Sequence, residues 1–124
     1  MSSVASAQSL VCALKVQSQG VTKCEASIIS SINGGTAFGG IGATMAIQAT
    51  KKLNVFSTVA VTDSEHLEQH IRIEENGSHD LTSSSSLFTS IGSFTVLEAK
   101  GVGARLRCMP FTGSEAEAKV LICQ

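Results

Sequence analysis

The sequence contains no tryptophan and no tyrosine, and five phenylalanines are its whole aromatic content. Tryptophan and tyrosine are the usual platforms on which proteins stack sugars and unpaired bases. Their absence argues against carbohydrate binding and single-stranded nucleic-acid binding. Lys and Arg number 9 against 10 Asp and Glu, so the chain also lacks the basic excess that grips phosphate backbones. We therefore expect no nucleic-acid partner.

Long hydrophobic runs are missing too. No run approaches the roughly 18 apolar residues of a membrane-crossing helix, so we expect no transmembrane segment. The composition is nevertheless 43% hydrophobic and 15% charged, which is typical of a folded domain and not of a disordered chain. At 124 residues the chain has the length of one domain. We expect a single domain over 1–124, with 1–7 as a leader remnant or an N-terminal tail.

Hydrophobic residues recur mainly with a period of two, which is the period of a β-strand. Gln19-Gly20 and Asn33-Gly34 read as turns, and Asn-Gly between alternating runs is a strong hairpin signal. The pattern predicts about eight short strands, near residues 10–16, 24–32, 43–52, 55–62, 71–73, 91–99, 102–110 and 118–123. The expected fold class is all-β: an antiparallel sandwich, jelly-roll-like, or a small barrel.

One short helix near 63–70 is an alternative within this fold. Thr62 and Glu65 have the spacing of a capping box, and Leu67 and Ile71 are four residues apart. Residues 76–86 are expected to form a polar loop that ends in four serines. Near the C-terminal end, Glu115 and Glu117 alternate with alanines, which we interpret as a turn leading into a charged strand face.

The four cysteines Cys12, Cys24, Cys108 and Cys123 are compatible with two disulfides in any of three pairings. Their spacing fits no zinc ligand set. Three of them fall in phase with the apolar residues of their strands, whereas Cys123 is out of phase and is the best candidate for a reactive or intermolecular thiol. Pairing Cys24 with Cys108, or Cys12 with Cys123, would tie the chain ends into the sheets, and the sequence does not choose.

The sequence does not decide between secretion and a cytoplasmic location. The N-terminal residues lack the basic and apolar regions of a signal peptide. Ala5-Ser6-Ala7 nevertheless resembles a leader cleavage site, which would favour secretion over a cytoplasmic location if Met1 does not belong to the mature chain. Asn76-Gly77-Ser78 is a glycosylation sequon, so Asn76 is a candidate acceptor, although an Asn-Gly turn explains the same residues.

Ionisable residues concentrate between Asp63 and Asp80, a segment that holds all the histidines and most of the acids. On a strand, His66, Glu68 and His70 project from one face at i, i+2 and i+4, where two imidazoles and a carboxylate suit zinc. Acidic and Asn/Ser-rich loops are an alternative source of calcium ligands. The competing interpretation is a solvated strand face with cross-strand salt links to Arg105 and Arg107, and with no cofactor.

Catalysis has little support in the sequence, since no serine lies in G-x-S-x-G and the glycines at 39–44 match no phosphate-binding pattern. We expect a non-catalytic module for binding or self-assembly, present as a homo-oligomer or with a protein partner. Strands 43–50 and 55–62 contain no proline, and Lys51 and Lys52 are the only charges between Gly42 and Thr62. Weakly protected strand edges of this kind invite pairing with another chain.

Three alternative functions remain. The first is a metal-dependent binding protein or enzyme that uses the His66, Glu68 and His70 face. The second is a carrier of a small apolar ligand, with an interior lined by Leu14, Ile28, Met45, Ile47 and Phe94.

The third alternative comes from composition. The bias toward Ser, Thr, Gly, Ala and Val with few aromatics resembles that of small barnacle cement proteins of simple composition. This resemblance implies a secreted adhesive or self-assembling surface protein. The chain departs from that composition in its modest lysine content and its clear hydrophobic core pattern, and no residue role is carried over.

Overall fold

The computed structural model describes residues 9–29, 42–62, 66–75, 81–111 and 113–124. Within these ranges the chain forms eight strands and one helix. The elements are β1 (Ser9–Ser18), β2 (Val21–Ile29), β3 (Gly42–Gln48), β4 (Leu53–Val61), β5 (His66–Glu75), β6 (Leu81–Ser90), β7 (Thr95–Ala99), β8 (Val102–Phe111) and α1 (Glu115–Cys123).

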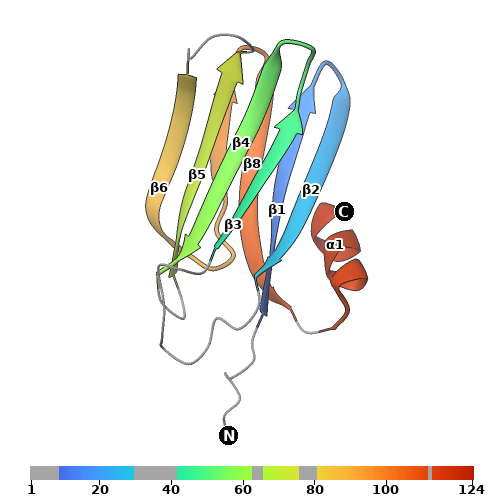
Figure 1. Cartoon of the computed structure of the whole chain (residues 1–124), viewed down its shortest axis with the longest axis vertical. Helices are drawn as coiled ribbons and strands as arrows, with labels where there is room; N and C mark the ends of the chain where they lie inside the picture. Colours follow the sequence, from blue (N-terminus) through green and yellow to red (C-terminus); the bar gives the residue numbers. More distant parts are fainter. Residues whose placement is uncertain (1–8, 30–41, 63–65, 76–80, 112) are drawn as a thin grey trace, which may run out of the picture.

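The strands form two antiparallel sheets of four strands each, which confirms the all-β prediction (Figure 1). Sheet A has the order β2-β1-β8-β7, and sheet B has the order β3-β4-β5-β6. The edge strands β2 and β3 lie next to each other on one side of the molecule (Figure 1). There the Lys23 ammonium donates to the backbone oxygen of Gln48 at 2.8 Å, which links the two sheets.

The core lies between the sheets and follows from the period-two pattern. Leu14 of β1 is opposite Leu106 of β8, and both side chains are fully buried. Ile71 and Ile73 of β5 bury the inner face of sheet B in the same way. One polar contact crosses this core, where the Thr95 hydroxyl of β7 donates to Oε1 of Gln69 on β5 at 2.9 Å. The two sheets therefore share one hydrophobic core.

Two tight hairpins fix the strand register of sheet A. Gln19 and Gly20, between β1 and β2, both have positive φ, at 52° and 78°. Lys100 and Gly101, between β7 and β8, repeat this at 55° and 79°. Two consecutive positive φ values match the right-handed twist of the flanking strands, and glycine adopts them without steric cost. The turn predicted at Gln19-Gly20 is confirmed.

The C-terminal segment is a helix, so the strand predicted at 118–123 is wrong. Ser114 is the N-cap: its hydroxyl accepts from the Glu117 backbone N–H at 3.1 Å, while the Glu117 carboxylate accepts from the Ser114 N–H at 3.1 Å. This reciprocal capping box satisfies two backbone donors at the helix start that have no acceptor within the helix. Ala118 and Ile122, four residues apart, are the buried side chains of α1.

The other two local predictions also fail. The short helix near 63–70 is absent from the described part of that range, because β5 begins at His66 and buries Leu67 and Gln69 on one face. The loop predicted at 76–86 becomes strand β6 from Leu81 onward, and residues 76–80 lie outside the described ranges. The predicted number of strands still agrees with the described structure, because the unpredicted strand β6 offsets helix α1, which was predicted as a strand.

Candidate functional site

All four cysteines form disulfides. Cys12 on β1 and Cys108 on β8 are opposite each other in register, with Cα atoms 4.0 Å apart, and both point into the core. Cys24 on β2 bonds Cys123 at the end of α1. The sequence left three pairings open, and the two bonds that it named, Cys24 with Cys108 and Cys12 with Cys123, do not form; the prediction of a reactive thiol at Cys123 is wrong. The error has one cause, because a helix lying over β2 brings Cys123 to Cys24, which a strand would not do.

Helix α1 covers part of the outer face of sheet A (Figure 1). Beneath it, Val11 and Ala13 of β1 form a second apolar cluster with Ala118 and Ile122. The cover ends at Lys15, whose ammonium donates to the backbone oxygen of Gln124 at 3.0 Å. Beyond this point the outer face of sheet A has no helix over it within the described residues.

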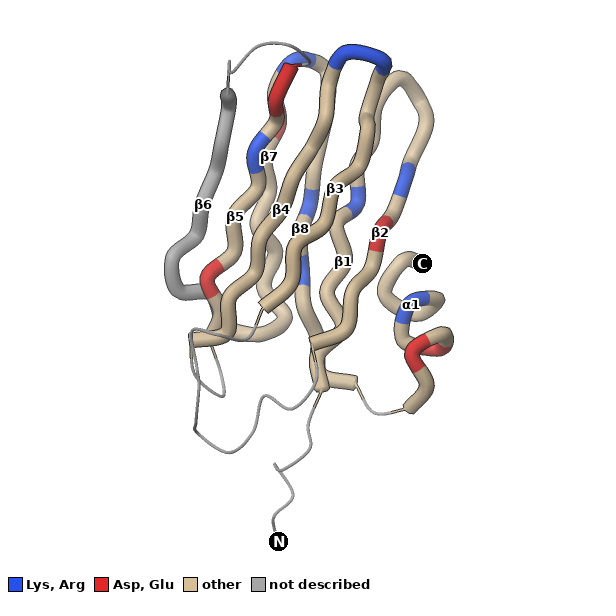
Figure 2. Tube along the Cα trace, in the orientation of Figure 1, with Lys and Arg blue, Asp and Glu red and all other residues tan. Residues whose placement is uncertain are grey.

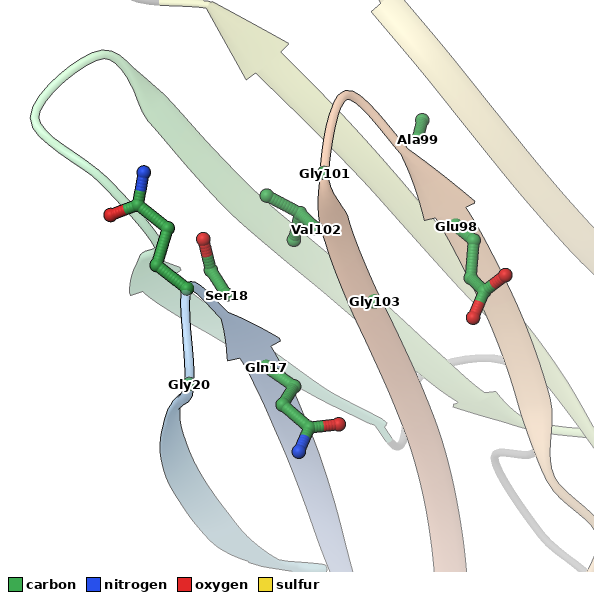
Figure 3. A pocket seen from close by; sticks show the side chains of 9 residues that line it. Gln17, Ser18, Gly20, Glu98, Ala99, Gly101, Val102 and Gly103 are labelled. Atoms are coloured by element: carbon green, nitrogen blue, oxygen red, sulfur yellow. The ribbon is translucent and has the colours of Figure 1, made fainter.

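The uncovered part of this face is hollowed along its length. A hollow of about 190 Å³ beside the end of α1 shares Lys15 and Arg105 with a neighbour of about 300 Å³. That neighbour shares Gln17, Glu98 and Gly103 with a third hollow of about 540 Å³ at the hairpin turns. Gln17 and Glu98 flank Gly103, which has no side chain to fill the space between them (Figure 3). We call this continuous surface the sheet A trough.

The end of the trough nearest α1 is positively charged. Lys15 and Arg105 are directly opposite each other on β1 and β8, where the Lys and Arg segments lie side by side (Figure 2). Arg105 and Arg107 both stack on the ring of Phe94, with the guanidinium carbons 4.2 Å and 4.7 Å from its centroid. Within the described residues no Asp or Glu side chain forms an ion pair with these three cations, and the Lys15 ammonium contacts the Gln124 backbone oxygen. The Arg-x-Arg spacing of Arg105 and Arg107 in the sequence places both arginines on one face of a strand. Nothing in the sequence indicates the Phe94 ring, which reaches them only because β7 pairs with β8.

Sheet B carries a similar stack with a different charge balance. The guanidinium of Arg72 on β5 lies 4.7 Å from the Phe56 ring centroid on β4. Here, however, the Arg72 Nε donates to the Glu74 carboxylate at 2.7 Å. The same cation–ring contact is therefore neutralised on sheet B and left positive on sheet A.

The predicted metal ligands lie in a row on the outer face of β5. His66 is half-buried, and Glu68 and His70 are exposed. Alternate residues of a strand are roughly 7 Å apart, so such a row does not converge on one point. Among the described residues no group of three or more His, Cys, Asp or Glu side chains could hold a metal ion. The salt links expected from this face to Arg105 and Arg107 are wrong, because β8 belongs to the other sheet.

The predicted carrier interior is also incorrect as a set. Leu14, Met45 and Ile47 do lie in the shared core. Ile28 instead packs under α1, and Phe94 is 46% exposed on the outer face of sheet A. The predicted glycosylation acceptor Asn76 lies outside the described residues.

A further hollow, which shares Ser18, Gln19 and Gly101 with the end of the trough at the hairpin turns, lies where the turns of the two sheets meet. It has a volume of about 700 Å³ and is lined in part by Lys51, Lys52 and Lys100, with Glu75 beside them. These lysines come from turns, whereas Lys15, Arg105 and Arg107 of the sheet A trough lie on paired strands.

The described part of the chain holds no helix with the length and apolar character needed to cross a membrane. No protein-family model matches the sequence, and no curated protein or solved structure shows a significant similarity to this chain.

Proposed function

We propose that the protein is a non-catalytic binding module that self-associates through the outer face of β3 and β4. The supporting observation is that eight neighbouring outward positions on these strands carry no charge. They are Gly42, Thr44, Ala46 and Gln48 on β3, and Asn54, Phe56, Thr58 and Ala60 on β4.

An uncharged sheet surface is unusual for a protein that stays monomeric. Natural sheets protect edge strands with lysine, proline, bulges or inward charges, and surfaces normally mix charges of both signs. Strand β3 is an edge strand with no proline and no charge, and it pairs with β4 without a register shift. The matching edge of sheet A differs, since β2 carries Lys23 and Glu25. The unprotected surface is therefore confined to one sheet.

Face-to-face packing suits this surface better than pairing along the β3 edge. Strand β2 runs beside that edge, and Lys23 already donates to the Gln48 carbonyl there. Most outward side chains of β3 and β4 are small, which allows two sheets to pack at the usual spacing of about 10 Å, while Phe56, next to β5, is covered by the Arg72 guanidinium. A second copy of the chain presents the same surface and is the occupant that this proposal names.

An oxidising compartment accompanies this proposal, because disulfides persist in secreted proteins and are rare in the cytosol. The two disulfides support secretion, so we propose that the self-assembling module acts outside the cytosol.

Native mass spectrometry and light scattering over a concentration series test the proposal. The wild-type protein should form dimers or larger species as its concentration rises. The Ala46→Lys variant should shift to monomer, because it puts an unpaired charge in the middle of the uncharged outward row of β3. Thr44→Lys is a second variant in case the first folds poorly, as judged by circular dichroism.

Val120→Lys is the matched control, since Val120 is 63% exposed on α1 and lies on the other side of the molecule. It should associate like wild type. A wild-type protein that stays monomeric at all concentrations would contradict the proposal, as would association abolished by Val120→Lys and unaffected by Ala46→Lys.

A further inference from the structure

We infer that the positively charged end of the sheet A trough is a binding site for a tetrahedral oxyanion, the group shared by sulfate and phosphate monoesters. The site consists of Lys15, Arg105 and Arg107 around Phe94. It lies on the opposite sheet from the proposed self-association face, so the two assignments are independent.

The first argument is that the fold brings like charges together. Lys15 and Arg105 are directly opposite on antiparallel strands, an arrangement that is destabilising when both are cations. Arg107 adds a third positive charge two residues along the same strand. A bound anion would offset this repulsion, because among the described residues no Asp or Glu side chain pairs with these cations and only Lys15 has an acceptor, the Gln124 backbone oxygen.

The second argument is preorganisation. One ring holds both guanidiniums, and cation–ring stacking fixes the plane of an arginine while leaving its N–H groups available. Arginine N–H groups donate in pairs to the oxygens of sulfate and phosphate. Lys15 is held in place by its bond to the Gln124 backbone oxygen. Little side-chain freedom is then lost when a ligand binds.

The third argument is shape. The hollow of about 190 Å³ beside α1 is lined by the three cations, Phe94 and Gln124, with Ala13 and Ile122 on its apolar side. It opens into the neighbouring hollow over Gly103, which provides room for the organic part of an ester. Glu98 borders that second hollow and is the acidic side chain on this face, so the anionic group is directed toward the α1 end.

Isothermal titration calorimetry with inorganic sulfate and inorganic phosphate tests the site, with chloride at matched ionic strength as the baseline. The wild-type protein should bind one sulfate or phosphate per chain. The double variant Arg105→Gln and Arg107→Gln should bind at least tenfold more weakly. Phe94→Leu keeps every charge and should bind several-fold more weakly, because the guanidiniums lose their common support.

Arg72→Gln is the matched control, because it removes an arginine that also stacks on a phenylalanine but already has a carboxylate partner. Its sulfate affinity should equal that of wild type. Equal affinity in wild type and the double variant would overturn the proposal, and so would an equal loss in Arg72→Gln or an absence of binding by wild type.

Two esters distinguish the source of the oxyanion. A sulfated disaccharide that binds more tightly than inorganic sulfate, with no gain for glucose 6-phosphate over inorganic phosphate, would assign a sulfate ester. The reverse result would assign a phosphate ester. Binding of the inorganic ions without binding of either ester would contradict a site for monoesters.

Discussion

The two sheets of this protein share one core but are held and exposed in different ways. Sheet A contains a disulfide between neighbouring strands, a second disulfide to α1, and the helix itself on its outer face. In the described residues sheet B has neither a disulfide nor a covering helix. Sheet A is therefore cross-linked by covalent bonds and covered by a helix, whereas sheet B is stabilised by its strand pairing and the burial of its inner face.

This difference extends to charge. The outer face of sheet A gathers Lys15, Arg105 and Arg107 around one ring, whereas β3 and β4 of sheet B present no charge on theirs. A rigid, charged surface suits recognition of an anion, and a flat, uncharged surface suits packing against an identical surface. The anion binding and the self-association that we propose therefore use the outer faces of different sheets.

The largest expected effect comes from removing the disulfide within sheet A. Cys12 and Cys108 are 96 residues apart, but the remaining Cys24–Cys123 bond shortens the covalent loop between them, so the chain-entropy account gives a stabilisation of about 3–4 kcal/mol. Cys12→Ala with Cys108→Ala should lower the free energy of unfolding by about that amount in urea. A loss below about 1 kcal/mol would show that sheet A does not depend on its covalent link.

A smaller difference in the free energy of unfolding is expected between variants that remove the buried hydroxyls of Thr95 and Ser57. Thr95→Val removes the donor to Gln69 and leaves a buried amide oxygen without that bond, so it should cost about 1–3 kcal/mol. Ser57, 4% exposed on β4, has no hydrogen-bond partner for its hydroxyl among the described residues. Ser57→Ala should therefore be neutral or stabilising. Urea titrations of both variants check this, and equal losses would contradict the different bonding of the two hydroxyls.

The smallest expected effect is at the start of α1. Hydrogen bonds from the Ser114 backbone N–H and hydroxyl lower the pKa of Glu117 below its usual value. A lowered pKa means that the charged carboxylate stabilises the fold above the unfolded pKa, and that this contribution is lost as the pH falls through the folded pKa.

Ser114→Ala should cost about 1 kcal/mol as a lost N-cap. It should also raise the pKa of Glu117 toward its usual value, which a carboxyl NMR titration would detect. An unchanged Glu117 pKa in Ser114→Ala would show that the side-chain part of the capping box is not formed in solution.

The sequence predicted the all-β class because alternation in segments such as Leu10–Val16 is a local property. It did not predict α1, although the Ser114 and Glu117 spacing was readable, because alternating Glu and Ala also fit a strand. For the same reason the sequence left the disulfide pairing undecided, since the partner of Cys123 depends on where the helix lies. The Arg105, Arg107 and Phe94 group was missed because β7 and β8 have to pair before the ring meets the arginines.

The most direct test of the separation between the two faces is a pair of amide NMR titrations on the wild-type protein. Dilution should shift the amide signals of β3 and β4, and sulfate should shift those around Lys15, Phe94 and Arg105. The account predicts two sets of signals that do not overlap. Dilution shifts that fall on α1 or β8, or the absence of any dilution shift, would contradict it.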